Sequence, residues 1–328
     1  MKDLWIGFDL GGTKMLTVAY DEDFKERGRR RRKTRGREGS DSGIQRIAST
    51  IERLLDENDL DRDRVAGIGI GCPGPIDLDK GRILMTPNLG WDNVDIQDYL
   101  SDQFRCDVTV LNDVDAGVYG EYRFGAAKSS RCAVGIFPGT GIGGGCVYED
   151  QILHGDGISC MEIGHTRISS SGRSSGYDLP GTLEAEASRL TIAAEAAKAA
   201  FRGEAPHLAK DAGTDLSEIR SGALADSVEN GDKAVRRLIE DACVTIGYAV
   251  VNVVHLLTPD TIVLGGGLVE AMEDLVVGTV KRTAKESVMA VYKNRFDVVA
   301  AKLGDDAGVL GAAAWARRAQ TGYIPVGR

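Results

Sequence analysis

A short segment near the N-terminus combines residue types that can bind a phosphate group and a metal ion. It lies between two apolar runs, Leu4 to Phe8 and Met15 to Tyr20, which we expect to be strands. Its candidate binding residues are Asp9, Gly11, Gly12, Thr13 and Lys14. Glycine N–H groups can approach an anion closely, Thr13 and Lys14 add donors, and Asp9 can hold magnesium through water. The alternative is an ordinary hairpin with a Gly-Gly turn.

A second copy of this pattern favours the phosphate-binding interpretation. Residues 134–150 align with residues 6–22 without a gap, so that Gly139 matches Gly11 and Val147 matches Ala19. This repeat predicts a duplicated domain with a second phosphate turn at Gly139, Thr140 and Gly141. Neither the GxxxxGK[ST] P-loop pattern nor a GxGxxG motif between a strand and a helix is present.

A carboxylate next to the end of a predicted strand is the candidate catalytic group. The run Val108 to Leu111 is followed by Asn112 and Asp113, the position where α/β domains usually bind ligands. The alternative is that this pair caps the helix that follows, since Asn and Asp are favoured there. The two interpretations are compatible.

Three further segments carry residues suited to a polar ligand. Glu162 and His165 are three positions apart, and Glu184 lies near the start of a helical segment. By itself such a Glu-His pair is more often a surface hydrogen bond. The glycines Gly265, Gly266 and Gly267 follow a predicted strand and allow close approach of a nucleotide.

Composition limits the possible classes of protein. The 328 residues are sufficient for two domains, 42% of them are hydrophobic, and the net charge of −9 argues against general nucleic-acid binding. We find no apolar run of membrane-spanning length, no signal peptide and no CxxC pair, so we expect a cytoplasmic protein with reduced thiols. The basic run Arg27 to Arg37 is either a nucleic-acid or polyphosphate patch or, as we expect, a solvated loop and exposed strand that continues the first sheet.

The remaining pattern predicts alternating helices and strands. We expect His255 to be buried in an apolar core helix, and residues 204–215 to be irregular. The expected strands are 65–70 and 260–264, and the expected helices are 41–57, 96–104, 115–124, 182–201, 243–257, one beginning at 268 and 308–318.

Several motifs, in order along nearly the whole chain, resemble the ROK family of sugar kinases and sugar-responsive repressors. They are DLGGTK at 9–14, GCPGPID at 71–77, ND at 112–113, GTGIGGG at 139–145, EIGH at 162–165, LEAEAS at 183–188 and IVLGGG at 262–267. The resemblance implies an α/β, two-domain actin-like ATPase fold, a duplicated ribonuclease H-like arrangement with a cleft between the domains. We expect a small domain at 1–116, joined by the helix 308–328, and a large domain at 117–307.

The resemblance also implies roles for single residues. Asp113 is expected to be the catalytic base on a sugar hydroxyl, because a carboxylate ionised at neutral pH can accept the proton late in phosphoryl transfer. Asn88, Asn112, Glu162, His165 and Glu184 are expected to hydrogen-bond the sugar. The two glycine hairpins and Gly265 to Gly267 are expected to hold ATP, with Mg²⁺ reached from Asp9 through water.

One departure from the family concerns zinc. The family carries CxCGxxGCxE after EIGH, where three thiolates and the histidine bind structural zinc. The three cysteine positions are occupied here by Ser175, Tyr177 and Thr182. We therefore expect no zinc, and we expect another device, such as Tyr177 packing or Pro180, to hold the loop 169–181.

The sequence thus predicts an ATP-dependent hexokinase of glucokinase type that phosphorylates the 6-hydroxyl of glucose. Fructose, mannose, N-acetylmannosamine and N-acetylglucosamine remain alternative substrates, and polyphosphate an alternative donor. A sugar-sensing regulator is disfavoured because no room precedes Leu4 for a helix-turn-helix. A non-catalytic sugar-binding protein is disfavoured by the presence of Asp9, Lys14 and Asp113. The family suggests a homodimer.

Overall fold

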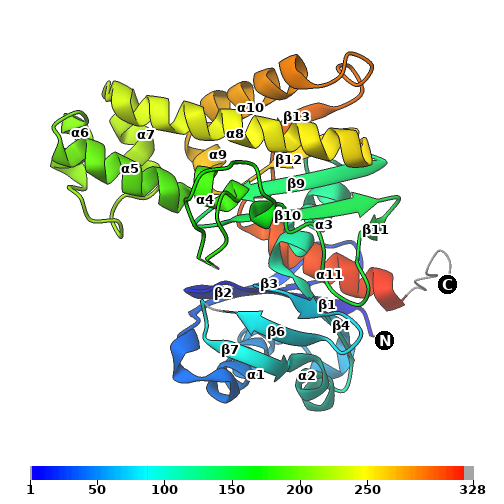
Figure 1. Cartoon of the computed structure of the whole chain (residues 1–328). Helices are drawn as coiled ribbons and strands as arrows, with labels where there is room; N and C mark the ends of the chain where they lie inside the picture. The colour runs from blue at the N-terminus through cyan, green and yellow to red at the C-terminus, as the bar shows by residue number, and fades with distance from the viewer. Residues whose placement is uncertain (1, 87, 177, 321–328) are drawn as a thin grey trace. The chain divides into compact units, whose positions relative to one another are not determined.

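The computed structural model describes residues 2–86, 88–176 and 178–320. These residues form two compact α/β units. Unit 1 contains the described residues up to Lys128, residues 150–160 and those from Asp305 onward, and unit 2 contains residues 129–149 and 161–304. Figure 1 shows both units along the chain.

The sheet of unit 1 carries the first predicted glycine turn. Its strand order is β3-β2-β1-β4-β8, with β1, β2 and β3 antiparallel and β1, β4 and β8 parallel. The bounds are β1 (Leu4–Leu10), β2 (Lys14–Tyr20), β3 (Glu26–Lys33), β4 (Val65–Cys72) and β8 (Asp107–Asn112). Since parallel strands end at one edge, Asp9 and Asp113 are placed at the same edge of this sheet.

Four strands of the second sheet repeat this arrangement in unit 2. β9 (Cys132–Pro138) is antiparallel to β10 (Ile142–Tyr148) and parallel to β12 (Thr261–Leu264), which pairs in parallel with β13 (Asp297–Ala300). The order β10-β9-β12-β13 corresponds to β2-β1-β4-β8. The duplication predicted from the two glycine hairpins is therefore confirmed.

The gapless alignment of the two hairpins is wrong by one residue in the returning strand. Leu10 pairs with Met15 across the first turn, whereas Pro138 pairs with Ile142 across the second, so the second turn is one residue shorter. As a result Cys146, and not Val147, takes the place that corresponds to Ala19.

Small residues bring the last helix of the chain onto the sheet of unit 1. α11 (Asp306–Gln320) packs on β1 and β4, as predicted from its Gly/Ala content (Figure 1). A Cβ built on Gly7 would lie 1.8 Å from the carbonyl oxygen of Val309, and one built on Gly69 would lie 1.8 Å from that of Ala312. Only glycine permits backbone contacts this close.

Unit 1 is completed by three further helices, by short 3-10 turns and by short strands. α3 belongs to unit 1 because it packs on α11, so the observed division differs from the predicted boundary after residue 116. The bounds are α1 (Ser40–Glu57), α2 (Ile96–Phe104), α3 (Asp113–Phe124), η1 (Gly36–Glu38), η2 (Arg62–Arg64), β5 (Ile76–Asp77), β6 (Arg82–Thr86), β7 (Trp91–Asp95) and β11 (Gln151–Ile152).

Unit 2 has helices that differ in places from those predicted. The expected helix 182–201 is interrupted at Ser188, which is extended (φ −67°, ψ 157°) and accepts a hydrogen bond from the Thr191 N–H as the N-cap of α5. Part of the expected irregular segment is helical, beginning at Pro206. The bounds are η3 (Ile163–His165), α4 (Leu183–Ala187), α5 (Arg189–Phe201), α6 (Pro206–Asp211), α7 (Ser221–Glu229), α8 (Lys233–Leu257), α9 (Gly267–Ala271) and α10 (Glu273–Ser287).

The expectation that His255 is buried is wrong. α8 buries one face in the core of unit 2, but its other face is exposed, with Leu256 80% exposed, and His255 accepts a hydrogen bond from the Met289 N–H at 3.2 Å. Among the described helices, α8 alone is long and apolar enough to cross a bilayer. Since 56% of its apolar window is buried inside the protein, this is weak evidence for a membrane segment.

Candidate active site

The first glycine turn is held in place from β3. Thr34, just past the end of β3, donates its hydroxyl to the Gly11 carbonyl at 2.6 Å, and its N–H donates to the Thr13 carbonyl at 2.9 Å. Thr34 is fully buried, whereas Lys14 is exposed at the start of β2. Sequence reasoning missed Thr34, because its only signal was a polar residue at the end of the basic strand.

Asp9 lies in a negative environment that suits a cation. Burial, followed by the nearby charges of Asp113 and Asp305, raises the pKa of Asp9 to about 7, and Arg31 partly offsets this. A Cβ on Gly308, in the first turn of α11, would lie 3.4 Å from the Asp9 carboxyl carbon. Because a divalent cation relieves repulsion among carboxylates, these residues fit a magnesium ion held near Asp9.

The backbone and one amide fix Asp113 at the start of α3. Asn112 is the N-cap, and its side chain accepts hydrogen bonds from Val114 N–H at 2.8 Å and Asp115 N–H at 3.3 Å. Its amide nitrogen donates to the Gly74 carbonyl at 3.2 Å. The capping interpretation of Asn112 is thus confirmed. Its role toward a sugar stays a prediction.

Two of the candidate residues of unit 1 approach one another beside the first turn. A Cβ on Gly12 would lie 3.7 Å from the Cβ of Asn88, which is exposed. The electrostatic coupling of Asp9 to Asp113 places both carboxylates in the same region of the sheet edge. Unit 1 therefore gathers a predicted base, a predicted metal contact and a predicted phosphate turn.

In unit 2 the EIGH segment packs directly on β10. A Cβ on Gly164 would lie 1.9 Å from the Ile142 carbonyl oxygen, so only glycine fits between the two segments. His165 Nε2 lies 3.9 Å from a carboxylate oxygen of Glu162. Burial raises the pKa of Glu162, the His165 charge opposes that shift, and the Glu184 charge adds to it. Glu162 thus interacts electrostatically with both His165 and Glu184, the other two residues of this unit that are predicted to bind the sugar.

Glu184 also supports the second glycine turn. Its carboxylate accepts a hydrogen bond from the Ile142 N–H at 3.0 Å, and a Cβ on Gly141 would lie 2.1 Å from the same oxygen. The Gly139 N–H closes the turn on the Gly141 carbonyl at 2.8 Å. A residue predicted to bind sugar therefore holds a predicted phosphate turn.

The third glycine segment lies against the same turn. Gly266 has a φ of +89°, and a Cβ there would lie 2.8 Å from the Pro138 carbonyl oxygen. Unit 2 therefore brings together the predicted nucleotide segments 139–141 and 265–267.

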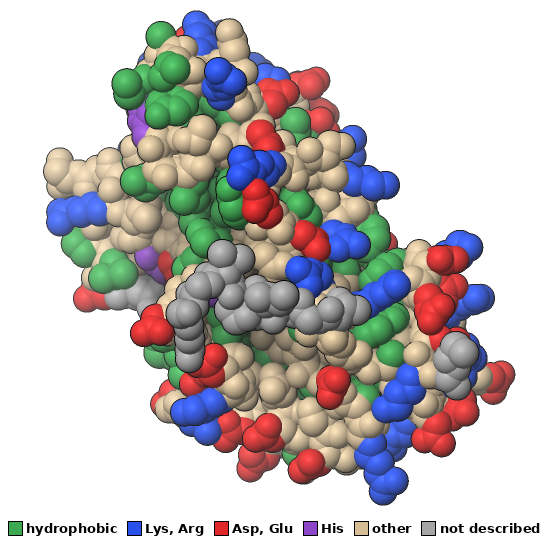
Figure 2. Space-filling model, turned by 90° about the vertical axis from the view of Figure 1, so that its right-hand side faces the viewer, with side chains coloured by type: hydrophobic (Ala, Val, Ile, Leu, Met, Phe, Trp, Pro, Cys, Tyr) green, Lys and Arg blue, Asp and Glu red, His purple; other side chains and the backbone are tan. Residues whose placement is uncertain are grey.

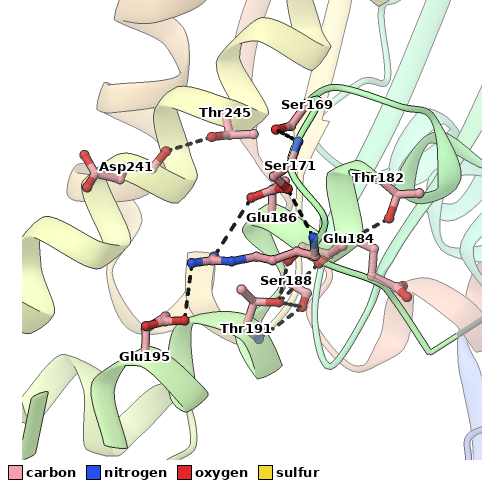
Figure 3. Close-up of polar contacts among 12 residues, drawn as sticks. Ser169, Ser171, Thr182, Glu184, Glu186, Ser188, Thr191, Glu195, Asp241 and Thr245 are labelled. Atoms are coloured by element: carbon pink, nitrogen blue, oxygen red, sulfur yellow. Dashed lines mark hydrogen bonds and ion pairs between the residues drawn. The ribbon is translucent and has the colours of Figure 1, made fainter. Parts of the chain in front are cut away.

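The loop before α4 is held by polar contacts where the family has zinc (Figure 3). The Ser171 hydroxyl hydrogen-bonds Glu186, and Arg173 pairs with Glu195 at 3.3 Å and with Glu186 at 3.9 Å. The Ile168 N–H donates to the Gly181 carbonyl at 2.9 Å. Of the three positions at which the resemblance implies cysteine in the family, Thr182 caps α4, Ser175 lies in the loop, and Tyr177 lies outside the described residues. Among the described residues, no group of three or more His, Cys, Asp and Glu side chains is clustered closely enough to hold a metal directly.

The basic run forms an exposed strand, as expected. Arg29 pairs with Asp306 at 2.8 Å, Arg31 with Asp305 at 2.7 Å and Arg27 with Asp21 at 3.0 Å. On the face drawn in Figure 2, acidic and basic side chains are interspersed rather than separated into single-sign patches. Much of the charge of β3 is therefore balanced within the chain.

Comparisons with known proteins agree with the motifs. Residues 5–319 match the ROK family. The chain is 32% identical to the glucokinase of Thermotoga maritima over 310 aligned residues. The alignment covers 94% of this chain and 95% of that protein.

Solved structures have the same fold. A ROK family glucokinase from Streptomyces griseus, in complex with glucose and AMPPNP, has a TM-score of 0.83 at 25% identity, covering 96% of this chain and 99% of that one. A ROK hexokinase from Thermus thermophilus has a TM-score of 0.78 at 27% identity, covering 97% and 100%. The expected two-domain actin-like ATPase fold is confirmed by these similarities and by the duplicated sheet.

Proposed function

The chain belongs to the ROK family, and we propose that it transfers the γ-phosphoryl group of ATP to the 6-hydroxyl of glucose. The observation that carries this proposal is the placement of Asp113. It begins α3 at the strand edge that also holds Asp9 and the first glycine turn, which supports the roles proposed for these residues as base, metal contact and phosphate turn. The similarity to enzymes named glucokinase supports glucose as the hexose.

In the proposed reaction Asp113 accepts a proton. The 6-hydroxyl oxygen of glucose forms a bond to the γ-phosphorus, the bond from that phosphorus to the β-phosphate oxygen breaks, and ADP leaves. The hydroxyl proton passes to the Asp113 carboxylate as transfer proceeds. Bound magnesium, reached from Asp9 through water, would neutralise phosphate charge.

The other candidate residues bind and orient the two substrates. Asn88, Asn112, Glu162, His165 and Glu184 are proposed to hydrogen-bond the hexose, because amides, carboxylates and imidazole can each serve hydroxyl groups as donors or acceptors. The phosphate chain and nucleoside are proposed to lie on three glycine segments and their neighbours: Gly11, Gly12, Thr13 and Lys14; Gly139, Thr140 and Gly141; and Gly265, Gly266 and Gly267.

An ATP-coupled assay against a panel of hexoses tests this function. We expect glucose to give the highest kcat/KM, ahead of mannose, fructose and the N-acetylated hexosamines. Asp113→Asn is expected to lower kcat by at least about 10²-fold, because it removes the general base. The matched control is Asp107→Asn at the exposed opposite end of β8, which should keep wild-type rates. Wild-type activity in Asp113→Asn would overturn the assignment.

The proposal extends to the setting of the enzyme. It places the protein in the cytoplasm as a homodimer that supplies glucose 6-phosphate to glycolysis. It takes neither nucleic acid nor membrane as a partner, and it needs no zinc. Sedimentation velocity tests the dimer, and metal analysis of the purified protein tests the zinc prediction. One tightly held zinc per chain would refute the latter.

A further inference from the structure

One arginine outside the family motifs is anchored on the second glycine turn. Arg189 is the first residue of α5, and its N–H donates to the Gly139 carbonyl at 3.0 Å. Its guanidinium donates to the Thr140 hydroxyl at 2.8 Å and, at 3.5 Å, to the Ile219 carbonyl. The positive charge is thus held beside a turn that is proposed to bind phosphate.

This charge has no acidic partner among the described residues. Neither Arg189 nor Arg220 forms an ion pair with any described carboxylate, in contrast to Arg29 and Arg31 on β3. Burial and the nearby charge of Arg220 both lower the pKa of Arg189. Two like charges, one of them half-buried, therefore lie near each other without a carboxylate to balance them. An anion would balance them.

The pair lies where the predicted nucleotide segments meet. Arg220 precedes Ser221, and a Cβ built on Gly267 would lie 3.0 Å from the Ser221 hydroxyl oxygen. Gly266 in turn lies against Pro138, at the start of the second glycine turn. One guanidinium is therefore anchored at segment 139–141, and the other belongs to a loop that contacts segment 265–267.

We propose that Arg189 and Arg220 bind the phosphate chain of the phosphoryl donor, as a cationic subsite of unit 2. The inference rests on the proposed function and adds two donor-binding residues that lie outside the motifs. A guanidinium suits this task because it is always charged and offers paired N–H donors to phosphate oxygens. Arg189 can keep its bond to Thr140 through one nitrogen while other N–H groups reach the ligand.

Direct binding measurements on the full chain test the subsite. Isothermal titration with ATP, inorganic triphosphate and adenosine is compared for the wild type, Arg189→Met, Arg220→Met and the control Arg202→Met. Arg202 pairs with Glu204 at 3.6 Å at the exposed end of α5. We expect each subsite variant to raise the Kd of ATP and of triphosphate about tenfold, which is typical for losing a charged hydrogen bond. Adenosine affinity and the KM for glucose should stay unchanged.

The comparison with adenosine separates phosphate binding from structural support. The Arg220 guanidinium donates to the Ser217 carbonyl of its own segment and, among the described residues, makes no hydrogen bond to the glycine turn, so Arg220→Met tests the subsite even if Arg189→Met fails to fold. Unchanged ATP and triphosphate affinity in Arg220→Met would overturn the proposal. Equal weakening of ATP and adenosine would also overturn it, because that pattern reports a distorted site.

This experiment is independent of the sugar assay. If the hexose panel gives no product while triphosphate binding depends on both arginines, the proposed function fails and the anion subsite stands. If glucose is phosphorylated and both variants keep the wild-type KM for ATP, the subsite fails and the function stands. A triphosphate Kd similar to that of ATP would identify the phosphate chain, rather than the nucleoside, as the main ligand.

Discussion

The Glu184 carboxylate accepts a hydrogen bond from the Ile142 N–H at 3.0 Å, so a residue proposed to bind sugar also holds the turn proposed to bind phosphate. We expect Glu184→Ala to raise the KM for glucose and the KM for ATP together, each by about tenfold, since a charged hydrogen bond contributes about 1.5–3 kcal/mol. Steady-state kinetics with each substrate varied in turn measure both constants.

The control for this prediction is His165→Ala. His165 belongs to the same candidate site and lies beside Glu162, with its Nε2 3.9 Å from a carboxylate oxygen, so its loss should raise the KM for glucose alone. A Glu184→Ala enzyme with an unchanged KM for ATP would contradict the coupling.

Asp9 should lower stability at high pH. Its pKa lies near 3.8 when exposed and is raised to about 7 in the folded protein, so its contribution to stability is complete below pH 3.8 and is lost as the pH rises through about 7. Asp9→Asn should therefore raise the free energy of unfolding at pH 8 by roughly 1–3 kcal/mol while abolishing kinase activity.

Urea unfolding of the magnesium-free protein at pH 5 and pH 8 checks this prediction. The gain of Asp9→Asn over the wild type should be larger at pH 8. A gain that is larger at pH 5 would contradict the sign of the effect.

Thr34 should support nucleotide binding through the first turn. Thr34→Val keeps the shape of the side chain but removes the hydroxyl bond to the Gly11 carbonyl, which leaves a buried acceptor without its partner. We expect a loss of about 1–3 kcal/mol in stability and a higher KM for ATP, measured by thermal unfolding and kinetics. Thr34→Ser retains the hydroxyl and should keep most of both properties.

Arg173 should stabilise the loop before α4. Arg173→Met removes the ion pairs to Glu186 and Glu195, so the loop before α4 should be cleaved faster by protease and the KM for glucose should rise. EDTA followed by excess magnesium should leave wild-type activity unchanged. Arg167→Met is the control, because the Arg167 guanidinium donates to the Ser169 carbonyl within the same loop.

Gly311 should be irreplaceable in α11. A Cβ there would lie 1.8 Å from the Ala116 carbonyl oxygen, so Gly311→Ala should force α3 and α11 apart and cost about 3 kcal/mol or more. Gly278→Ala in α10 meets nothing within 4 Å and should stabilise the protein by up to about 1 kcal/mol. Chemical unfolding of the two variants distinguishes them.

Most strands and the long helices could be predicted because their signals are local. The run Leu4 to Phe8 and the spacing of apolar residues in α1 each depend on a few neighbouring side chains. The interruption at Ser188 was missed because a single serine cap interrupts an otherwise continuous Ala-rich pattern. The exposed face of α8 was missed because composition alone does not say which side the core covers.

The candidate site was predictable only in part for a similar reason. Glycine turns and carboxylates at strand ends can be recognised from the local sequence. Thr34 and Arg189 instead act through contacts with residues 21 or more positions away, which the local sequence does not reveal. The one-residue difference between the two turns was also hidden, because it appears only in the strand register.

The dependence of the first sheet on α11 has a consequence for how the chain matures. During synthesis β1 and β4 are made before α11, the helix that packs against Gly7 and Gly69 of these strands. Unit 2 is nearly continuous in sequence, so it can fold before α11 is made. Until then the apolar face of β1 and β4 in unit 1 stays exposed. Nascent chains halted shortly before residue 305 are therefore expected to expose the apolar face of β1 and β4 that α11 covers in the complete unit.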